Sequence, residues 1–308
     1  MVTMTATRLP IDILRSRFGA ALREQVKLAP YTSARIGGMA DAVLTIQTVE
    51  ELSNALQFFW EHHLNYYILG GGSNILVSDK GFRGIVLLNR ARSVQFSSDR
   101  EPRVLAESGV VFSNLANRCA AKGLAGIEWA SAVPGTIGGA VYGNAGAFDG
   151  DISGSLIRAE ILTQSGLETW PVKKFDYGYR TSILKRGEIK AVVLSAELAL
   201  ALSDRTTVSK KLEQFGRERK ASQPPGASMG SMFKNPPGDF AGRLIESAGL
   251  KGTRVGNAQI SNRHANFFVN HGQTSASDVR ALIDLAVRTV REKCGVTLEL
   301  EIELVGEW

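Results

Sequence analysis

The sequence contains few of the residues that bind metals or form disulfides. Its 308 residues include 4 histidines and 2 cysteines, and Cys119 and Cys294 lie far apart at no metal-binding spacing. This pattern argues against a zinc site and against a disulfide framework. No apolar run approaches the ~18 residues that cross a membrane, and the first residues contain no long apolar core. We therefore expect no metal, no membrane insertion and a cytoplasmic location.

Aromatic residues are also scarce, at 7% of the chain, while the net charge is +6. Residues 201–236 carry seven Lys or Arg against three Asp or Glu, and aromatic residues are sparse in this basic run. Nucleic-acid binding is therefore not expected, although it stays open as an alternative together with non-catalytic nucleotide binding. An anionic small molecule would suit the basic segment equally well.

The length predicts two or three domains at ~100–200 residues each. Changes in the pattern of strands, helices and glycines divide the chain into residues 1–83, 84–202 and 203–308, with residues 1–30 as a lead-in. The mixture of helical and strand patterns predicts the α+β class: two small α/β units and an α+β C-terminal unit. We find no internal repeat and no sign of an obligate protein partner.

The first unit shows a strand, a helix and a second strand in succession. A strand is expected at Ala42–Thr48, and Thr48 and Glu51 have the spacing of a capping box at the start of the next helix. Leu52, Leu56, Phe59 and Trp60 give that helix its apolar face. Tyr66–Leu69 and Ile75–Val77 read as strands on either side of a glycine loop.

The other two units follow from the same kinds of signal. In the second unit the pattern predicts one helix at Ser113–Ala121 and short strands, which are Ile85–Leu88, Val94–Ser97, Val104–Glu107, Arg158–Thr163, Glu168–Val172 and Ala191–Leu200. In the third unit it predicts a basic helix from about Ser203, a helix at Phe240–Ser247 and a long helix from Ser277 that ends at Gly295. A last strand alternates from Val296 to Leu304, with Glu299, Glu301 and Glu303 on its polar face.

Two glycine loops suggest a nucleotide ligand. Gly70–Asn74 follows a strand, where backbone N–H groups can converge on a phosphate. It matches neither a Walker A loop nor the Gly-x-Gly-x-x-Gly fingerprint. Pro134–Gly146 carries five glycines and almost no charge, which suits a backbone packed against a flat ligand. The residues alone support two interpretations about equally: a dinucleotide held between the two loops, or a pair of tight turns.

The motif Tyr67–Leu76 resembles the pyrophosphate loop of the vanillyl-alcohol-oxidase (PCMH) type of FAD-binding domain. Together with four further motifs in the same order, it resembles the UDP-N-acetylenolpyruvoylglucosamine reductase (MurB) family from about residue 32 to 306. Those motifs are Ala132–Gly146, Tyr177–Arg180, Gly230–Pro236 and Leu298–Ile302.

The resemblance implies that NADPH reduces FAD, which then delivers a hydride to the enolpyruvyl ether of UDP-N-acetylglucosamine. It makes Ser231 the proton donor to the resulting enolate, Arg180 the cation that holds the carboxylate, and Glu301 a further catalytic residue. It places Lys234, Asn235 and Gln259 at the substrate. The residues implied for FAD are Gly70, Gly71, Gly72, Ser73, Asn74, Pro134, Gly135, Thr136, Gly138, Gly139, Asn144 and Gly146.

The chain also departs from parts of the family. About ten residues separate Arg180 from the strand at Ala191, which leaves no room for the tyrosine-bearing insertion of the longer type. The chain thus resembles the shorter, second type. No histidine lies between His63 and His264, so non-covalent FAD is expected. A sugar or alcohol oxidase of the same fold is the rival interpretation, but it has no need for Ser231 and its neighbours.

Overall fold

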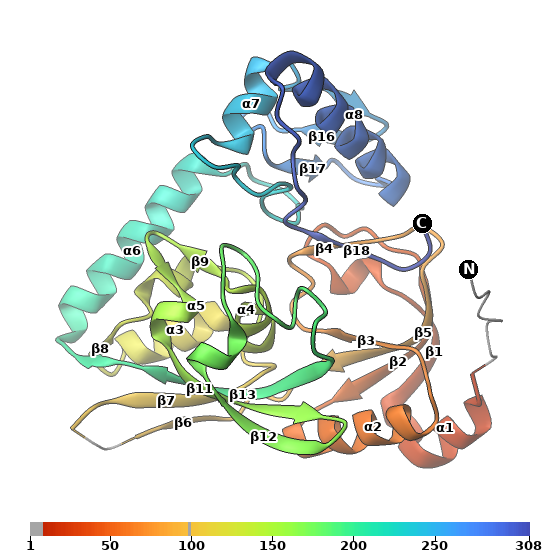
Figure 1. Ribbon diagram of the computed structural model, residues 1–308, viewed down its shortest axis with the longest axis vertical. Helices are drawn as coiled ribbons and strands as arrows, with labels where there is room; N and C mark the ends of the chain where they lie inside the picture. Colours follow the sequence, from red (N-terminus) through yellow and green to blue (C-terminus); the bar gives the residue numbers. More distant parts are fainter. Residues whose placement is uncertain (1–8, 98–99) are drawn as a thin grey trace.

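The computed structural model describes residues 9–97 and 100–308, and the first eight residues of the predicted lead-in lie outside them. Figure 1 shows three units at the corners of a triangle: the first in red and orange, the second in yellow and green, and the third in blue. None of the helices in this described part is long and apolar enough to cross a membrane. The α+β fold expected from the sequence is confirmed.

The first unit is a four-stranded sheet with the order β1-β2-β5-β3. Its elements are α1 (Ile11–Phe18), β1 (Leu22–Lys27), β2 (Met39–Ile46), α2 (Val49–Glu61), β3 (Tyr66–Leu69) and β5 (Phe82–Asn89). Thr48 accepts a hydrogen bond from the Glu51 amide and the Glu51 carboxylate accepts one from the Gln47 amide, so the predicted N-terminus of α2 is confirmed. The predicted boundary after residue 83 falls inside β5, which pairs with β2 as far as Asn89.

The second unit is an antiparallel sheet with the order β12-β11-β13-β7-β6. Its main elements are β6 (Val94–Phe96), β7 (Arg103–Glu107), α3 (Phe112–Ala120), α4 (Ile137–Gly143), β11 (Leu156–Thr163), β12 (Gly166–Pro171) and β13 (Ala191–Ala199). Shorter elements are β8 (Leu124–Ala125), β9 (Gly146–Ala147), β10 (Gly150–Asp151), α5 (Ile152–Ser155) and β14 (Ala201–Leu202). Five of the six strands predicted for this unit are present, with ends that differ by at most two residues, and the sixth, Ile85–Leu88, is part of β5 in the first unit.

The third unit packs two helices against a small sheet. Its elements are α6 (Arg205–Ser222), α7 (Ala241–Ser247), β15 (Arg254–Val255), β16 (Ala258–Ile260), β17 (Phe268–Asn270) and α8 (Ala276–Cys294). A capping box between Ser275 and Asp278 starts α8, and Gly295 ends it in the left-handed conformation, as predicted. In Figure 1, α6 runs from the second unit up to the rest of the third.

The predicted last strand is much shorter than its alternating pattern suggested. Only β18 (Glu303–Val305) is a strand, and it pairs in parallel with β4 (Ile75–Val77) of the first unit. Residues 296–302 cross from the third unit to the first, and no continuous partner strand accompanies them. The alternation itself is real, because Leu298 and Ile302 are buried. Alternate residues of this segment are buried between units, which gives the same alternation of apolar and polar residues as a strand with one buried face.

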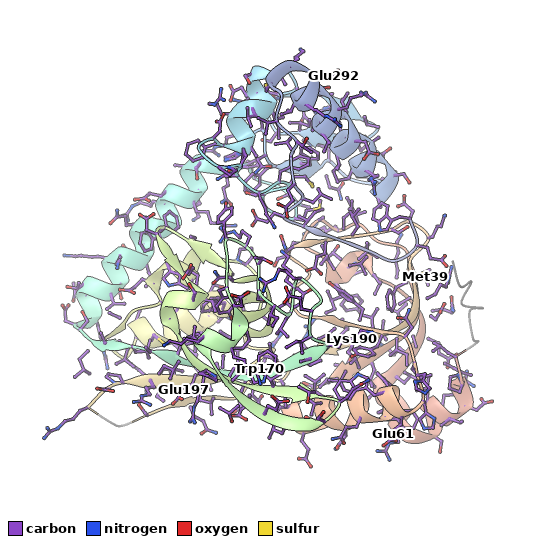
Figure 2. All side chains as sticks on the ribbon, in the orientation of Figure 1. Met39, Glu61, Trp170, Lys190, Glu197 and Glu292 are labelled. Carbon is purple, nitrogen blue, oxygen red and sulfur yellow. The ribbon has the colours of Figure 1, made fainter. Side chains whose placement is uncertain are left out.

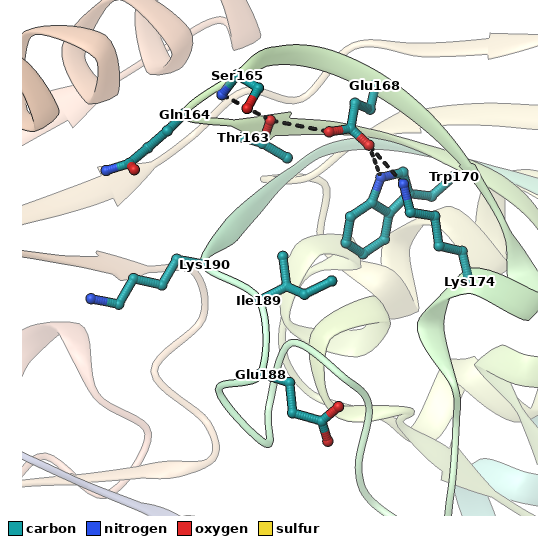
Figure 3. Close-up of a pocket in the computed structure, with 9 residues that line it drawn as sticks. All are labelled: Thr163, Gln164, Ser165, Glu168, Trp170, Lys174, Glu188, Ile189 and Lys190. Atoms are coloured by element: carbon teal, nitrogen blue, oxygen red, sulfur yellow. Dashed lines mark hydrogen bonds and ion pairs between the residues drawn. The ribbon is translucent and has the colours of Figure 1, made fainter.

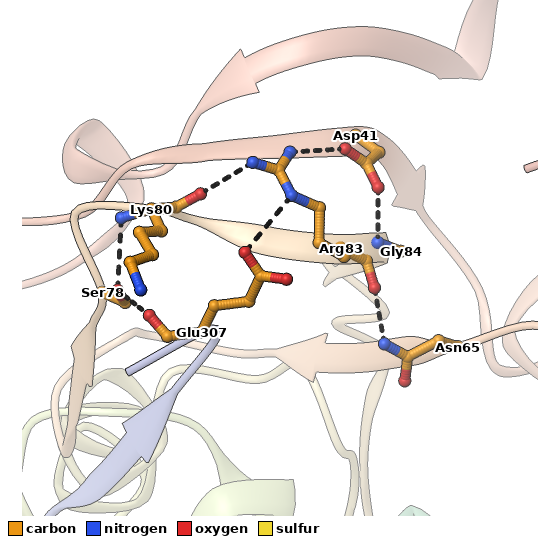
Figure 4. Close-up of polar contacts among 7 residues, drawn as sticks. All are labelled: Asp41, Asn65, Ser78, Lys80, Arg83, Gly84 and Glu307. Carbon is orange, nitrogen blue, oxygen red and sulfur yellow. Dashed lines mark hydrogen bonds and ion pairs between the residues drawn. The ribbon is translucent and has the colours of Figure 1, made fainter. Parts of the chain in front are cut away.

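The returning C-terminal segment is fastened to the first unit by the contacts in Figure 4. The Ser78 hydroxyl donates to the Glu307 carbonyl, and Arg83 lies 2.9 Å from Asp41 and 3.6 Å from the Glu307 carboxylate. Side chains also fill the spaces between the units (Figure 2), and the core of the third unit includes Ile36 and Leu76 of the first. The position of residues 299–303 is therefore fixed at both ends.

Candidate active site

The two glycine loops meet where the first and second units touch. A Cβ built on Gly71 would lie 2.8 Å from the Cα of Gly135, and one on Gly70 would lie 2.3 Å from the Thr136 hydroxyl. The Ser73 hydroxyl also donates to the Pro134 carbonyl across 3.3 Å. Only glycines allow backbones to approach this closely. The two loops thus form one continuous surface. The sequence alone could not distinguish this arrangement from two separate tight turns.

One face of α4 is suited to a flat ligand such as FAD. Gly138 packs on Ser108, with only 2.9 Å left for a Cβ. On the other side, a Cβ at Gly139 would meet only the Thr136 hydroxyl, at 3.9 Å, and one at Gly143 would meet nothing within 4 Å. Residues four apart share a helix face, so this face exposes backbone that no side chain covers. The residues present therefore fit a cofactor that approaches the backbone closely.

Arg180 reaches the C-terminal segment from a strained turn. Its φ of 57° lies in the left-handed region, which is uncommon outside glycine and clusters at functional sites. Its Nε donates to the Glu301 carboxylate at 3.0 Å, and its Nη2 donates to the Gly146 carbonyl at 2.6 Å. The side-chain amide of Asn144 fixes the turn by donating to the Gly178 carbonyl. A residue that sequence alone could not single out is thus held between the second glycine loop and Glu301.

The stretch that carries Ser231 pairs with two segments, and one of them carries Glu301. Ser231 forms an isolated bridge with Phe267 on one side. On the other side, the Glu301 amide donates to the Met232 carbonyl at 3.0 Å. The serine and the carboxylate therefore come from adjacent extended segments. The structure joins Arg180 to Glu301 by an ion pair and places the backbone of Ser231 in the stretch that pairs with residue 301. A catalytic role for the three residues stays a prediction.

Glu301 occupies a partly buried and strongly charged environment. The side chains of Glu301 and Arg180 are 17% and 24% exposed. Burial raises the pKa of Glu301, whereas the positive charges of Arg180, Lys185 and Lys234 lower it, and burial outweighs them. A solvated strand face, the alternative to an active-site position, therefore does not fit Glu301, whereas Glu299, with a side chain 71% exposed, fits it.

The three residues expected at the substrate have different surroundings. Lys234 is 16% exposed and forms an ion pair with Glu299 at the edge of the site. Asn235 is exposed, and its Oδ1 accepts from the Ala241 amide at the start of α7. Gln259 is buried, and its amide contacts the Gly252 carbonyl, Arg254 and His271 within the small sheet. A substrate contact for each of these residues stays a prediction.

Sequence reasoning missed Lys185 and Glu303. The Lys185 ammonium donates to the Glu301 carbonyl at 3.2 Å. Burial raises the pKa of Glu303, whose carboxylate faces Tyr67 and Tyr142. Both residues lie close to a motif in the sequence. From the sequence alone, however, a single charged side chain is expected to face solvent, because its long-range neighbours are unknown.

A polar hollow at the β11–β12 hairpin is a second place where a ligand could be sought (Figure 3). The Glu168 carboxylate there accepts from Thr163 at 3.2 Å, Trp170 at 2.8 Å and Lys174 at 2.7 Å. None of the expected site residues lines it, and its carboxylate is already occupied by these donors. We assign it no part in the reaction.

Comparison with known proteins identifies the class. A family model described as an FAD binding domain matches residues 40–169, which include both glycine loops. The meeting of these loops and the open face of α4 agree with that match. The fold and the site are those of an FAD-dependent oxidoreductase.

The family follows from three further findings. The model for the C-terminal domain of UDP-N-acetylenolpyruvoylglucosamine reductase matches residues 221–305. The enzymes of that name from Chloroflexus aggregans and Rubrobacter xylanophilus are 43% and 42% identical over 92% and 91% of this chain, and over 97% and 94% of their own lengths. The crystal structure of this reductase (MurB) from Thermus caldophilus matches with a TM-score of 0.78 and 35% identity over 92% of this chain and 99% of that one. The chain belongs to the UDP-N-acetylenolpyruvoylglucosamine reductase family, which confirms the resemblance found in its motifs.

Proposed function

We propose that the chain uses NADPH and non-covalently bound FAD to reduce UDP-N-acetylglucosamine enolpyruvate to UDP-N-acetylmuramate in peptidoglycan precursor synthesis. One observation supports the assignment of residues: Arg180 forms an ion pair with Glu301, whose backbone pairs with the stretch that carries Ser231. The proposal includes a cytoplasmic location, where NADPH is supplied.

FAD, when bound, supplies the redox chemistry by taking a hydride from NADPH and delivering it to the methylene carbon of the enolpyruvyl ether. Addition at that carbon breaks the double bond and moves an electron pair toward the carboxylate. Arg180 stabilises this charge, because a guanidinium has five N–H donors and only two are used by Glu301 and Gly146.

Ser231 completes the reduction by donating its hydroxyl proton to the α-carbon. A serine is a weak acid, but the enolate dianion is a strong base, so no neighbouring histidine is needed. The position of Ser231 next to the Glu301–Met232 hydrogen bond supports this role. Glu301, held by Arg180, orients the groups around the enolate.

The basic side chains at the edge of the site suit the diphosphate of the substrate. Lys234 lies next to this cluster, and its ion pair with the exposed Glu299 can exchange for a phosphate contact. Asn235 and Gln259 are the further substrate contacts in this proposal.

The function is tested with the purified protein. It should be yellow, with the absorption bands of oxidised flavin, and should consume NADPH quickly only when the enolpyruvyl sugar nucleotide is added. UDP-N-acetylmuramate should form in equal amount to the NADPH consumed. Flavin reduction by an alcohol or sugar, with oxygen as the acceptor, would instead favour the oxidase alternative.

A further inference from the structure

Lys185 is a partly buried lysine on the same loop as Arg180. Its backbone amide donates to the Ser182 hydroxyl at 3.2 Å, and that hydroxyl donates to the Tyr142 carbonyl of α4 at 2.6 Å. The loop thus holds the base of the lysine side chain against the second unit. Its ammonium group contacts a neutral carbonyl, that of Glu301, at 3.2 Å.

The Glu301 carbonyl accepts a second hydrogen bond from the first unit. The Asn74 side-chain amide donates to it at 3.0 Å, and the Glu303 amide donates to the Asn74 carbonyl at 3.0 Å. One peptide group therefore joins the first glycine loop, the Arg180 loop and the C-terminal segment. Lys185 is thus one of two side chains that hold the Glu301 carbonyl, and it links that backbone to the loop that carries Arg180.

The charges around Lys185 reinforce this placement. Burial lowers its pKa, whereas the nearby carboxylates of Glu303 and Glu301 raise it. Lys234 and Arg180 lower it further, so the pKa of Lys185 lies below its usual range. In return, Lys185 lowers the pKa of both Glu301 and Glu303. Buried charges near one another depend on such compensation.

We infer that Lys185 is a positioning residue for the reduction: through the carbonyl of Glu301 it fixes the backbone of that residue, and its charge compensates the carboxylates of Glu301 and Glu303. This inference rests on the role proposed above for Glu301. Together with Arg180, Lys185 would set the position and the protonation state of the Glu301 carboxylate.

The test compares Lys185→Met, Lys185→Arg and Lys190→Met in the FAD-loaded enzyme. Lys190 is exposed, lies five residues further on, and extends away from the side chains around it in Figure 3. We expect Lys185→Met to slow flavin reoxidation by the enolpyruvyl substrate at least ~10-fold while flavin reduction by NADPH stays within about twofold. Its kcat should fall more than its KM changes, and Lys185→Arg should restore most of the rate.

The pH profile of reoxidation separates positioning from simple packing. Because Lys185 lowers the pKa of Glu301, its removal should move the inflection due to Glu301 to higher pH, and Lys185→Arg should not. A Lys185→Met enzyme with the rate and profile of the wild type would overturn the inference. So would a loss that Lys185→Arg fails to restore. If Lys185→Met loses FAD, the same pH profile of reoxidation is measured for Lys185→Gln. Glutamine keeps a hydrogen-bond donor but lacks the charge. A wild-type enzyme that the substrate cannot reoxidise would instead contradict the proposed function.

Discussion

Glu301 accepts a hydrogen bond from Arg180 at 3.0 Å, although 121 residues separate them in the chain. Arg180 belongs to the second unit, and Glu301 lies on the segment that returns from the third unit to the first. The pair therefore depends on the assembled arrangement of all three units. A site of this kind should lose activity through changes that leave each unit folded.

Glu301→Gln should reduce turnover by about 10²-fold or more, because glutamine keeps the size of the side chain but loses the charge that Arg180 holds. FAD content and flavin reduction by NADPH should be nearly unchanged. Rapid-mixing measurement of the two half-reactions separates these effects.

Glu292→Gln is the control for this change, because Glu292 is exposed on α8 at the far end of the third unit (Figure 2). It should alter turnover by less than about tenfold, under ~1.4 kcal/mol of barrier. Equal, mild effects of the two substitutions would remove Glu301 from the proposed active site.

Ser231→Ala should leave flavin reduction by NADPH nearly normal and slow reoxidation by the enolpyruvyl substrate by orders of magnitude. The reason is that the proposed proton transfer follows hydride addition, so the first half-reaction does not need the hydroxyl. Ser228→Ala, in the same stretch, is the matched control and should resemble the wild type. An equal loss in both half-reactions would show that Ser231 acts on structure instead.

Local signals in the sequence predicted much of the fold. Thr48 and Glu51 define the start of α2, and Gly295 defines the end of α8, because caps depend on residues close in the chain. The glycine loops and Ser231 were found through motifs. The structure adds the contact of Gly71 with Gly135, which explains why both loops need glycine.

Long-range contacts could not be predicted in the same way. The pattern of the last strand suggested that Glu301 and Glu303 face solvent, whereas β18 docks on β4 and directs Glu303 toward Tyr67 and Tyr142. A charged residue has the same local sequence signal whether it lies in water or between units. Only the fold decides which of the glutamates is buried.

Asp79 should stabilise the junction between the first and third units. Its carboxylate accepts from the Ala276 amide at 2.7 Å and from the Ser277 amide at 2.9 Å, at the start of α8. Burial raises the pKa of Asp79, but these hydrogen bonds more than offset that and lower it below 3.8. Asparagine keeps an acceptor but loses the negative charge at the N-terminus of α8, so Asp79→Asn should cost about 0.5 kcal/mol of stability at neutral pH.

The pH dependence has a definite sign. A carboxylate with a lowered pKa in the folded state gives its full stabilisation above pH ~3.8 and loses it as the pH falls through the folded-state pKa. The difference in thermal midpoint between wild type and Asp79→Asn should thus be constant near neutrality and shrink below pH ~4. Glu292→Gln, at an exposed side chain of α8, should show no such difference. Equal thermal midpoints of wild type and Asp79→Asn at neutral pH would contradict the capping role.

The open face of α4 gives the sharpest test of where the cofactor lies. Gly143 and Gly216 are both helical glycines whose added Cβ would meet nothing within 4 Å, so a side chain at either position starts in open space. Leucine also has a better helix propensity than glycine by up to ~1 kcal/mol. If FAD packs against α4, Gly143→Leu should give folded, colourless protein, whereas Gly216→Leu on α6 should stay yellow. The ratio of flavin to protein absorbance, with the thermal midpoint as a check of folding, measures both. A Gly143→Leu protein with full FAD would place the cofactor away from this face of α4.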